Sequence, residues 1–93
     1  MKRLFLGSNK FQFVPEEIGE LTQLVELDLR KNEIAILPNS LKKCVEIEHL
    51  NFGDNKLTEL PQELITSLSK IRELYLYRNK IEALPEDMGV LRN

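Results

Sequence analysis

The segment LVELDLRKNEIAILPNSLKKCVE, residues 24–46, carries the pattern that decides the fold of this chain. It has apolar residues at positions 1, 4, 6, 11, 14, 18 and 21, asparagine at position 9 and proline at position 15. Residues 1–23, 47–70 and 71–93 follow the same pattern closely, with asparagines at 9, 55 and 79 and prolines at 15, 61 and 85. Self-similarity at a period of roughly 20–50 residues is typical of proteins built from stacked repeats.

Positions 4 and 6 of each repeat predict a short strand with one buried face. Side chains two residues apart leave the same face of a strand, so these two point inward and their neighbours point to solvent. A single strand cannot bury them, and we expect the repeats to stack. Stacking aligns the apolar residues in two columns: Leu4, Leu27, Leu50 and Leu74, then Leu6, Leu29, Phe52 and Leu76. The sequence therefore predicts a four-stranded parallel sheet along one side of a coil.

The proline at position 15 predicts the start of a helical turn on the outer side of the coil, because its fixed φ suits a first helical turn. In the third repeat the apolar pair Leu64 and Leu68 has the i, i+4 spacing of an α-helix, so we expect the longest outer helix over 62–69. The other outer segments are expected to be shorter or 3₁₀-like. Cys44 occupies an apolar position of the pattern and is expected to be a small buried side chain.

An asparagine closes the strand segment of every repeat, and its side chain has two donors and an acceptor for the backbone groups that a turn leaves unpaired. We expect a structural ladder of buried amides that links neighbouring repeats. Its members are Asn9, Asn32, Asn55 and Asn79.

This pattern resembles the leucine-rich repeat family. The 23-residue spacing and the pairs Val14-Pro15, Leu37-Pro38, Leu60-Pro61 and Leu84-Pro85 are similar to the intracellular class found in Ras-pathway and cell-polarity scaffolds, although similar repeats occur in bacterial proteins. The resemblance implies an α/β solenoid: a right-handed coil with its parallel sheet on the concave face and short helical or 3₁₀ segments on the convex face. It also implies a role in binding other proteins.

Composition excludes several other functional classes. The chain has 93 residues, 42% of them apolar, and a net charge of -2, which argues against disorder and against binding to nucleic acid. One cysteine and one histidine provide neither a disulfide nor a metal site, and the sequence has no glycine-rich phosphate loop and no nucleophile–histidine–acid set. We therefore expect no catalytic residues, no enzyme activity, no metal and no cofactor.

The sequence also predicts the cellular location of the protein and the organisation of its repeats. The sequence lacks a secretion signal, a membrane-spanning apolar stretch and an Asn-X-Ser/Thr site, which favours the cytoplasm. Residues 1–93 form one array of repeats 1–23, 24–46, 47–70 and 71–93. Both end repeats keep the interior pattern without polar caps, so we expect a fragment of a longer array, or self-association through the uncapped ends.

The outward positions 2, 3, 5, 7, 8 and 10 of the repeats are free to vary and are the candidate binding surface. Together they carry nine basic and six acidic residues, whereas the remaining positions carry four basic and nine acidic residues. A mildly basic inner face favours a partner with an acidic segment. The alternative is that these mixed charges are an ordinary solvated surface.

Tyr75 and Tyr77 stand two residues apart on this outward surface, where the packing of the repeats does not require aromatic residues. Tyrosine and arginine are frequent energetic anchors of interfaces, so we expect Tyr75, Tyr77 and Arg78 to form the centre of a binding site. The structural alternative is packing of Tyr75 on Asn51, or contact of the pair with a further repeat.

Further candidate partner-binding residues lie on the same surface: Phe5, Asp28, Arg30 and His49. His49 is expected between Glu26 and Glu73 of the neighbouring repeats, about one strand spacing of ~4.8 Å from each backbone. That position favours an imidazolium, and the alternative is a solvated neutral side chain.

The function expected from these observations is a non-catalytic protein-interaction module that binds a partner protein through the concave sheet face. An alternative is a substrate-recruiting segment of a larger signalling enzyme such as a kinase, a GTPase or a ubiquitin ligase. A structural spacer is a third hypothesis.

Overall fold

The structure is a computed structural model that describes residues 2–81. Seven short elements follow one another along the chain: β1 (Arg3–Phe5), η1 (Glu16–Glu20), β2 (Glu26–Asp28), η2 (Asn39–Lys43), β3 (His49–Asn51), α1 (Gln62–Ser67) and β4 (Glu73–Tyr75). The labels η1 and η2 denote 3₁₀ helices. The outer segment expected around Pro85 lies outside the described residues.

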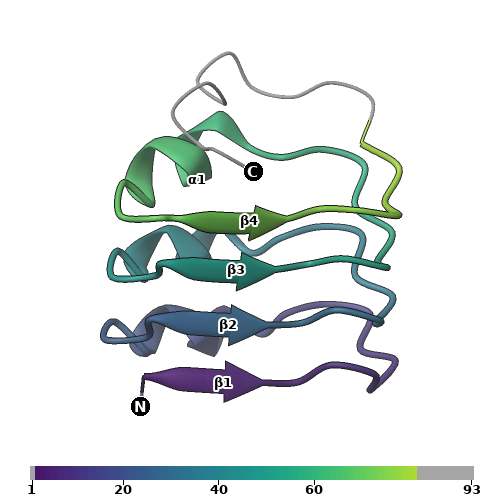
Figure 1. Ribbon diagram of the computed structural model, residues 1–93, viewed down its shortest axis with the longest axis horizontal. Helices are drawn as coiled ribbons and strands as arrows, with labels where there is room; N and C mark the ends of the chain where they lie inside the picture. Colours follow the sequence, from purple (N-terminus) through teal and green to yellow (C-terminus); the bar gives the residue numbers. More distant parts are fainter. Residues whose placement is uncertain (1, 82–93) are drawn as a thin grey trace.

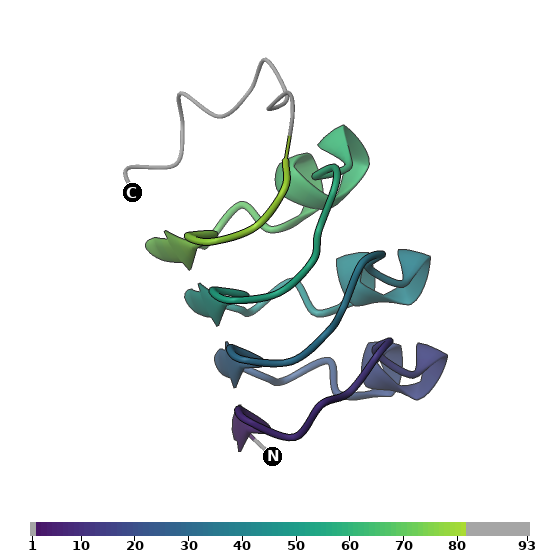
Figure 2. The ribbon, with the colours of Figure 1, turned by 90° about the vertical axis from the view of Figure 1, so that its right-hand side faces the viewer.

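The strands form one parallel sheet in the order β1-β2-β3-β4, with each strand beside the next one in sequence. Leu4, Leu27, Leu50 and Leu74 are aligned in register across it. The strands stack on one side of the coil, and η1, η2 and α1 stack on the other (Figures 1 and 2). The predicted α/β solenoid with a four-stranded parallel sheet is therefore confirmed.

The core lies between the sheet and the outer helices and is built from the repeated apolar positions. Leu27, Leu50 and Leu74 are at most 3% exposed, and Phe52 of the second column is fully buried. Each aliphatic side chain buried in this way contributes about 1.5–3 kcal/mol to folding. Leu4 and Leu6 of the first repeat are only partly buried against this core.

Each described outer segment begins directly after a proline in an extended conformation, as the sequence predicts. The first two are five-residue 3₁₀ helices, and α1 is a six-residue α-helix. Among the three outer segments within residues 2–81, that of the third repeat is thus the longest, as predicted, although α1 ends at Ser67. Leu64, Ile65 and Leu68 are buried, which gives this segment the broader apolar face that a full α-helical turn buries.

Cys44 is fully buried behind η2, and its thiol donates a hydrogen bond to the carbonyl oxygen of Ile18 at 3.2 Å. Burial raises the pKa of this thiol. Because only the thiolate is a good nucleophile or metal ligand, Cys44 acts here as a small core side chain.

The chain turns sharply after each strand. The residue at position 8 of each repeat has a φ of 54–61°, in the left-handed region: Ser8, Lys31, Asp54 and Arg78. This turn frees the carbonyl groups at the strand end, which the following asparagine then satisfies. The Nδ2 of Asn55 donates to the carbonyl oxygens of Phe52 and Gly53 in its own repeat and, at 2.8 Å, to that of Leu29 in the repeat before.

The same amide links the repeats in the other direction. The Oδ1 of Asn55 accepts a hydrogen bond from the backbone N–H of Ile34, one repeat earlier. Asn32 and Asn79 form corresponding bonds: Asn32 donates to Leu6 and accepts from Phe11, and Asn79 accepts from Leu57. These amides therefore join each repeat to its predecessor. Asn9 donates to two carbonyls within its own turn.

No helix among residues 2–81 has the length and apolar character that crossing a membrane demands.

Replacing Asn55 with alanine should destabilise the fold more than the same change at Asn9. Asn55→Ala leaves the buried N–H of Ile34 unpaired and removes one of the two amide donors to the carbonyls of Leu29 and Phe52, so the free energy of unfolding should fall by about 1–3 kcal/mol. Asn9 is exposed and its side chain bonds only within its own turn, so Asn9→Ala should cost less than about 1 kcal/mol. Urea unfolding followed by circular dichroism measures both values, and equal costs would contradict the role of the ladder.

Candidate functional site

The outward side of the sheet, which we call the sheet face, is made of residues that the core does not use. Strand register places them in lateral rows that run across the four repeats. The row at position 3 holds Arg3, Glu26, His49 and Glu73, and the row at position 5 holds Phe5, Asp28, Asn51 and Tyr75. Two residues further along the chain, the position-7 row holds Gly7, Arg30, Gly53 and Tyr77.

The position-3 row contains two contacts between polar side chains of neighbouring strands. His49 lies between Glu26 and Glu73, as expected, and its Nδ1 is 2.6 Å from the Oε1 of Glu73. Glu26 instead lies 3.7 Å from the guanidinium of Arg3. His49 is therefore held by one of its two carboxylate neighbours and is half-buried.

Asp28 and Arg30 form a local pair at the end of β2. One carboxylate oxygen of Asp28 accepts a hydrogen bond from the backbone N–H of Arg30, and the other lies 3.4 Å from its Nε. The Arg30 side chain also lies over Gly7, whose missing Cβ would be 3.3 Å from its Cγ. The guanidinium is thus held close to the sheet instead of extending freely into solvent.

Tyr75, Tyr77 and Arg78 lie together at the β4 end of the sheet face. Tyr75 is 39% exposed and Tyr77 45% exposed, although both are aromatic. The pKa of Tyr75 is raised by the negative charge of Glu73, by burial, by the hydrogen bond that its hydroxyl donates to the Glu73 side chain, and by the neighbouring Tyr77. Arg78 donates to the carboxylate of Asp54 at 3.5 Å. The structure therefore brings these three candidate residues into one exposed group.

Gly53 gives Tyr77 its position. A Cβ on Gly53 would lie 2.2–2.5 Å from three carbons of the Tyr77 ring, so the ring occupies the space that any other residue would fill. This stacking over a glycine just beyond β3 restricts the ring, which is nevertheless 45% exposed. Sequence reasoning missed Gly53. The sequence feature that could have revealed its role is the alternation of glycine with a large residue along the position-7 row.

Phe5 does not belong to the tyrosine group. It is 59% exposed at the end of β1, the opposite edge of the sheet from β4. Three strand spacings, about 14 Å, separate the two strands. The candidate residues therefore divide into a tyrosine–arginine group on β4, a central set formed by Asp28, Arg30 and His49, and a separate phenylalanine on β1.

The charges of this surface are largely paired with one another. Each of five carboxylates lies within 4 Å of a basic group on the same surface: Glu26, Asp28, Glu48, Asp54 and Glu73. Between residues 2 and 81, no ion pair involves Lys10, Lys31, Lys56 or Lys80. Across that same stretch, no group of three or more histidine, cysteine and carboxylate residues has the arrangement needed to hold a metal ion.

Comparison with known proteins agrees with this architecture. The profile of the family described as Leucine Rich Repeat matches residues 23–44 and 46–68. A leucine-rich repeat protein of Leptospira interrogans, with a solved structure, is 37% identical and superimposes with a TM-score of 0.88 over 97% of this chain, which covers 23% of that protein. The chain belongs to the leucine-rich repeat proteins.

Two similar proteins are much longer enzymes. An adenylate cyclase of Schizosaccharomyces pombe is 34% identical over the whole of this chain, and the probable serine/threonine-protein kinase pats1 of Dictyostelium discoideum is 32% identical. The chain spans 6% of the cyclase and 3% of the kinase. The likeness therefore concerns a short segment of each of these proteins.

Substituting Gly53 should release the Tyr77 ring. The chain has two tyrosines and no tryptophan, so in a Tyr75→Phe background Tyr77 alone emits. Adding Gly53→Ala should increase quenching of that emission by acrylamide, because the ring must leave the sheet. The free energy of unfolding should fall by only about 1 kcal/mol, since an exposed ring relieves overpacking by rotating.

Gly7→Ala in the same background is the matched control, because a Cβ there meets Arg30 and leaves Tyr77 untouched. Quenching that stays constant in the Gly53 variant would show that the ring does not rest on this glycine.

Proposed function

We propose that this chain is a non-catalytic protein-interaction module that binds a partner protein through the sheet face, with Tyr75, Tyr77 and Arg78 at the centre of contact. The observation that supports it is the exposed tyrosine pair, held in place beside an ion-paired arginine. The core does not require these residues, because corresponding positions in the other repeats hold glycine, asparagine, serine or charged residues as well.

The restricted position of Tyr77 makes it suited to binding. A side chain that is already ordered loses little conformational entropy when a partner covers it, whereas a freely rotating one loses about 0.5–1.5 kcal/mol. The ring of Tyr77 is restricted by Gly53, and Arg78 is restrained by Asp54. Tyrosine and arginine in such positions are typical of interface anchors.

The surrounding sheet face supplies the remaining contacts. Phe5 adds apolar area at the far edge, while Asp28, Arg30 and His49 add paired polar groups in the centre. Because five of the six acidic residues at the outward positions already have basic partners, the lysines at the margin of the sheet face are available to an acidic segment of the partner. The partner is therefore proposed to carry one.

The repeat class and the cellular setting belong to the same proposal. The 23-residue leucine–proline spacing favours the intracellular class of leucine-rich repeats, and the composition favours the cytoplasm. The uncapped interior pattern of the first repeat, where Leu4 and Leu6 are only partly buried, supports a longer array or self-association.

Replacing the anchors should weaken partner binding strongly without unfolding the chain. In Tyr75→Ala/Tyr77→Ala/Arg78→Glu, loss of a hot spot worth about 2 kcal/mol or more raises the Kd by at least about 30-fold. The partner is isolated from cell extract on the wild-type chain and identified by mass spectrometry. Its Kd for both chains is then measured with purified proteins, and circular dichroism confirms that the variant is folded.

A matched triple variant on the opposite side, Glu20→Ala/Lys43→Glu/Val45→Ala, changes an equal number of exposed residues in and after η1 and η2. It should keep the wild-type Kd. Undiminished binding by the anchor variant would exclude this group as the contact, and a structural spacer predicts that both variants are silent.

A second candidate function is a recruiting segment within a larger signalling enzyme. The observation that favours it is the small share of the cyclase and kinase that this chain covers, 6% and 3%. In this case the repeats position a substrate or regulator, and catalysis takes place in another domain of the same polypeptide.

An antibody against the repeats distinguishes the two functions on a denaturing gel of cell extract. A recruiting segment predicts a band far above 10.8 kDa, the mass of this chain. A band at 10.8 kDa would exclude the second function and leave the first.

A further inference from the structure

Two exposed apolar side chains stand side by side on a flank of the coil, away from the sheet face. Phe13 and Ile36 occupy position 13 of adjacent repeats, and each is 70% exposed. The third repeat has the exposed residue Glu59 at this position. The fold accepts a charged residue there, so the packing of the repeats does not explain the apolar pair.

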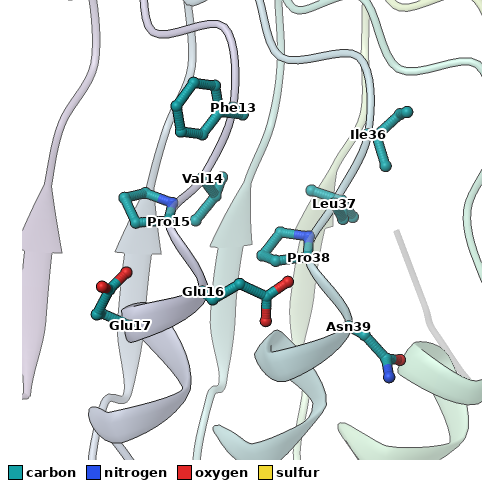
Figure 3. A pocket seen from close by; sticks show the side chains of 9 residues that line it. All are labelled: Phe13, Val14, Pro15, Glu16, Glu17, Ile36, Leu37, Pro38 and Asn39. Carbon is teal, nitrogen blue, oxygen red and sulfur yellow. The ribbon is translucent and has the colours of Figure 1, made fainter.

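The two side chains border a groove that spans both repeats. It has a volume of about 540 Å³, with Val14-Pro15 and Leu37-Pro38 along it and Glu16, Glu17 and Asn39 at one end. Figure 3 shows Phe13 and Ile36 above the two proline rings, with the carboxylate of Glu16 lying between the two repeats.

The groove is preformed because the helices below it are held together. The hydroxyl of Ser40 donates to the carbonyl oxygen of Glu16 at 2.7 Å, which joins η2 to η1. Gly19 permits this approach, since a Cβ there would lie 2.8 Å from the Ser40 carbonyl. A rigid concave site needs little ordering when it is occupied.

The acidic end of the groove indicates the charge of its occupant. Both Glu16 and Glu17 are exposed, and within residues 2–81 neither carboxylate forms an ion pair. A basic side chain beside an apolar one would complement this end, and an acidic one would be repelled. A short extended segment is favoured, because the site is open to solvent and spans only two neighbouring repeats.

From this geometry we infer that the flank groove is a second docking site, which takes a short extended segment of a partner protein with large apolar side chains followed by lysine or arginine. The apolar side chains pack between Phe13 and Ile36 over the prolines, and the basic group pairs with Glu16 and Glu17. This surface is distinct from the sheet face, so the two sites are able to bind different segments.

Three synthetic octapeptides test the inference by nuclear magnetic resonance on the ¹⁵N-labelled full chain. The first carries leucine and phenylalanine followed by arginine and lysine, the second replaces the basic pair by two glutamates, and the third replaces the apolar pair by two serines. The first should bind saturably and shift the backbone amide signals of the non-proline residues in 13–17 and 36–39. The other two should bind at least about tenfold more weakly, because each lacks one of the two contacts.

Two variants locate the binding. Phe13→Gln/Ile36→Gln places glutamine at position 13 of both repeats. The fold tolerates a side chain of this shape there, because Glu59 occupies the same position in the third repeat. This variant should raise the Kd of the first peptide at least about tenfold. Glu16→Lys/Glu17→Lys should reverse the preference between the first and second peptides. The sheet-face variant Tyr75→Ala/Tyr77→Ala/Arg78→Glu should bind the first peptide normally, which separates failure of this inference from failure of the proposed function.

Several outcomes would overturn the inference: no binding of the first peptide, equal binding of all three, or shifts confined to the sheet face. A change from dimer to monomer in Phe13→Gln/Ile36→Gln, measured by light scattering, would also overturn it, because the groove would then hold a second copy of this chain.

Discussion

The structure depends on the attachment of each repeat to the one before it. A three-residue strand buries too little surface to be stable alone, so Leu27, Leu50 and Leu74 are stable only as a column. The asparagine amides make this stacking specific, because each one joins backbone groups of two repeats. Slippage of one repeat by a residue would leave those buried groups unpaired and turn the leucines toward solvent.

Because the inward leucines and the asparagines stabilise the fold, the outward residues are free to take part in binding. Positions 4, 6 and 9 build the coil, whereas positions 3, 5 and 7 only have to be compatible with a strand. The types of residue on the sheet face differ between its centre and its β4 edge. Paired polar side chains occupy the centre, around His49 and Asp28, while the exposed aromatic residues Tyr75 and Tyr77 lie on and directly after β4. An interface centred on β4, with a polar surround, follows the usual anatomy of protein contacts.

The fold could be predicted from the sequence because the same pattern of residue types recurs in every repeat. The period was enough to predict the columns and the parallel sheet, and the i, i+4 spacing of Leu64 and Leu68 predicted the longer α-helix of the third repeat. The surface was less predictable. Sequence placed His49 between two carboxylates, but the choice of Glu73 over Glu26 depends on side-chain rotamers and on the competing Arg3. The stacking of Tyr77 on Gly53, and the groove between Phe13 and Ile36, depend on spacing between repeats that no pattern of residue types specifies.

Amide hydrogen exchange measured by nuclear magnetic resonance tests the stacking most directly. The N–H of Ile34 bonds to the side chain of Asn55, and the N–H of Leu29 bonds to the carbonyl of Asn51 on the next strand. Both groups depend wholly on the following repeat. If the repeats are joined as described, these two amides exchange as slowly as the most protected amides of the chain. Rapid exchange at both, in a chain that is otherwise protected, would contradict it.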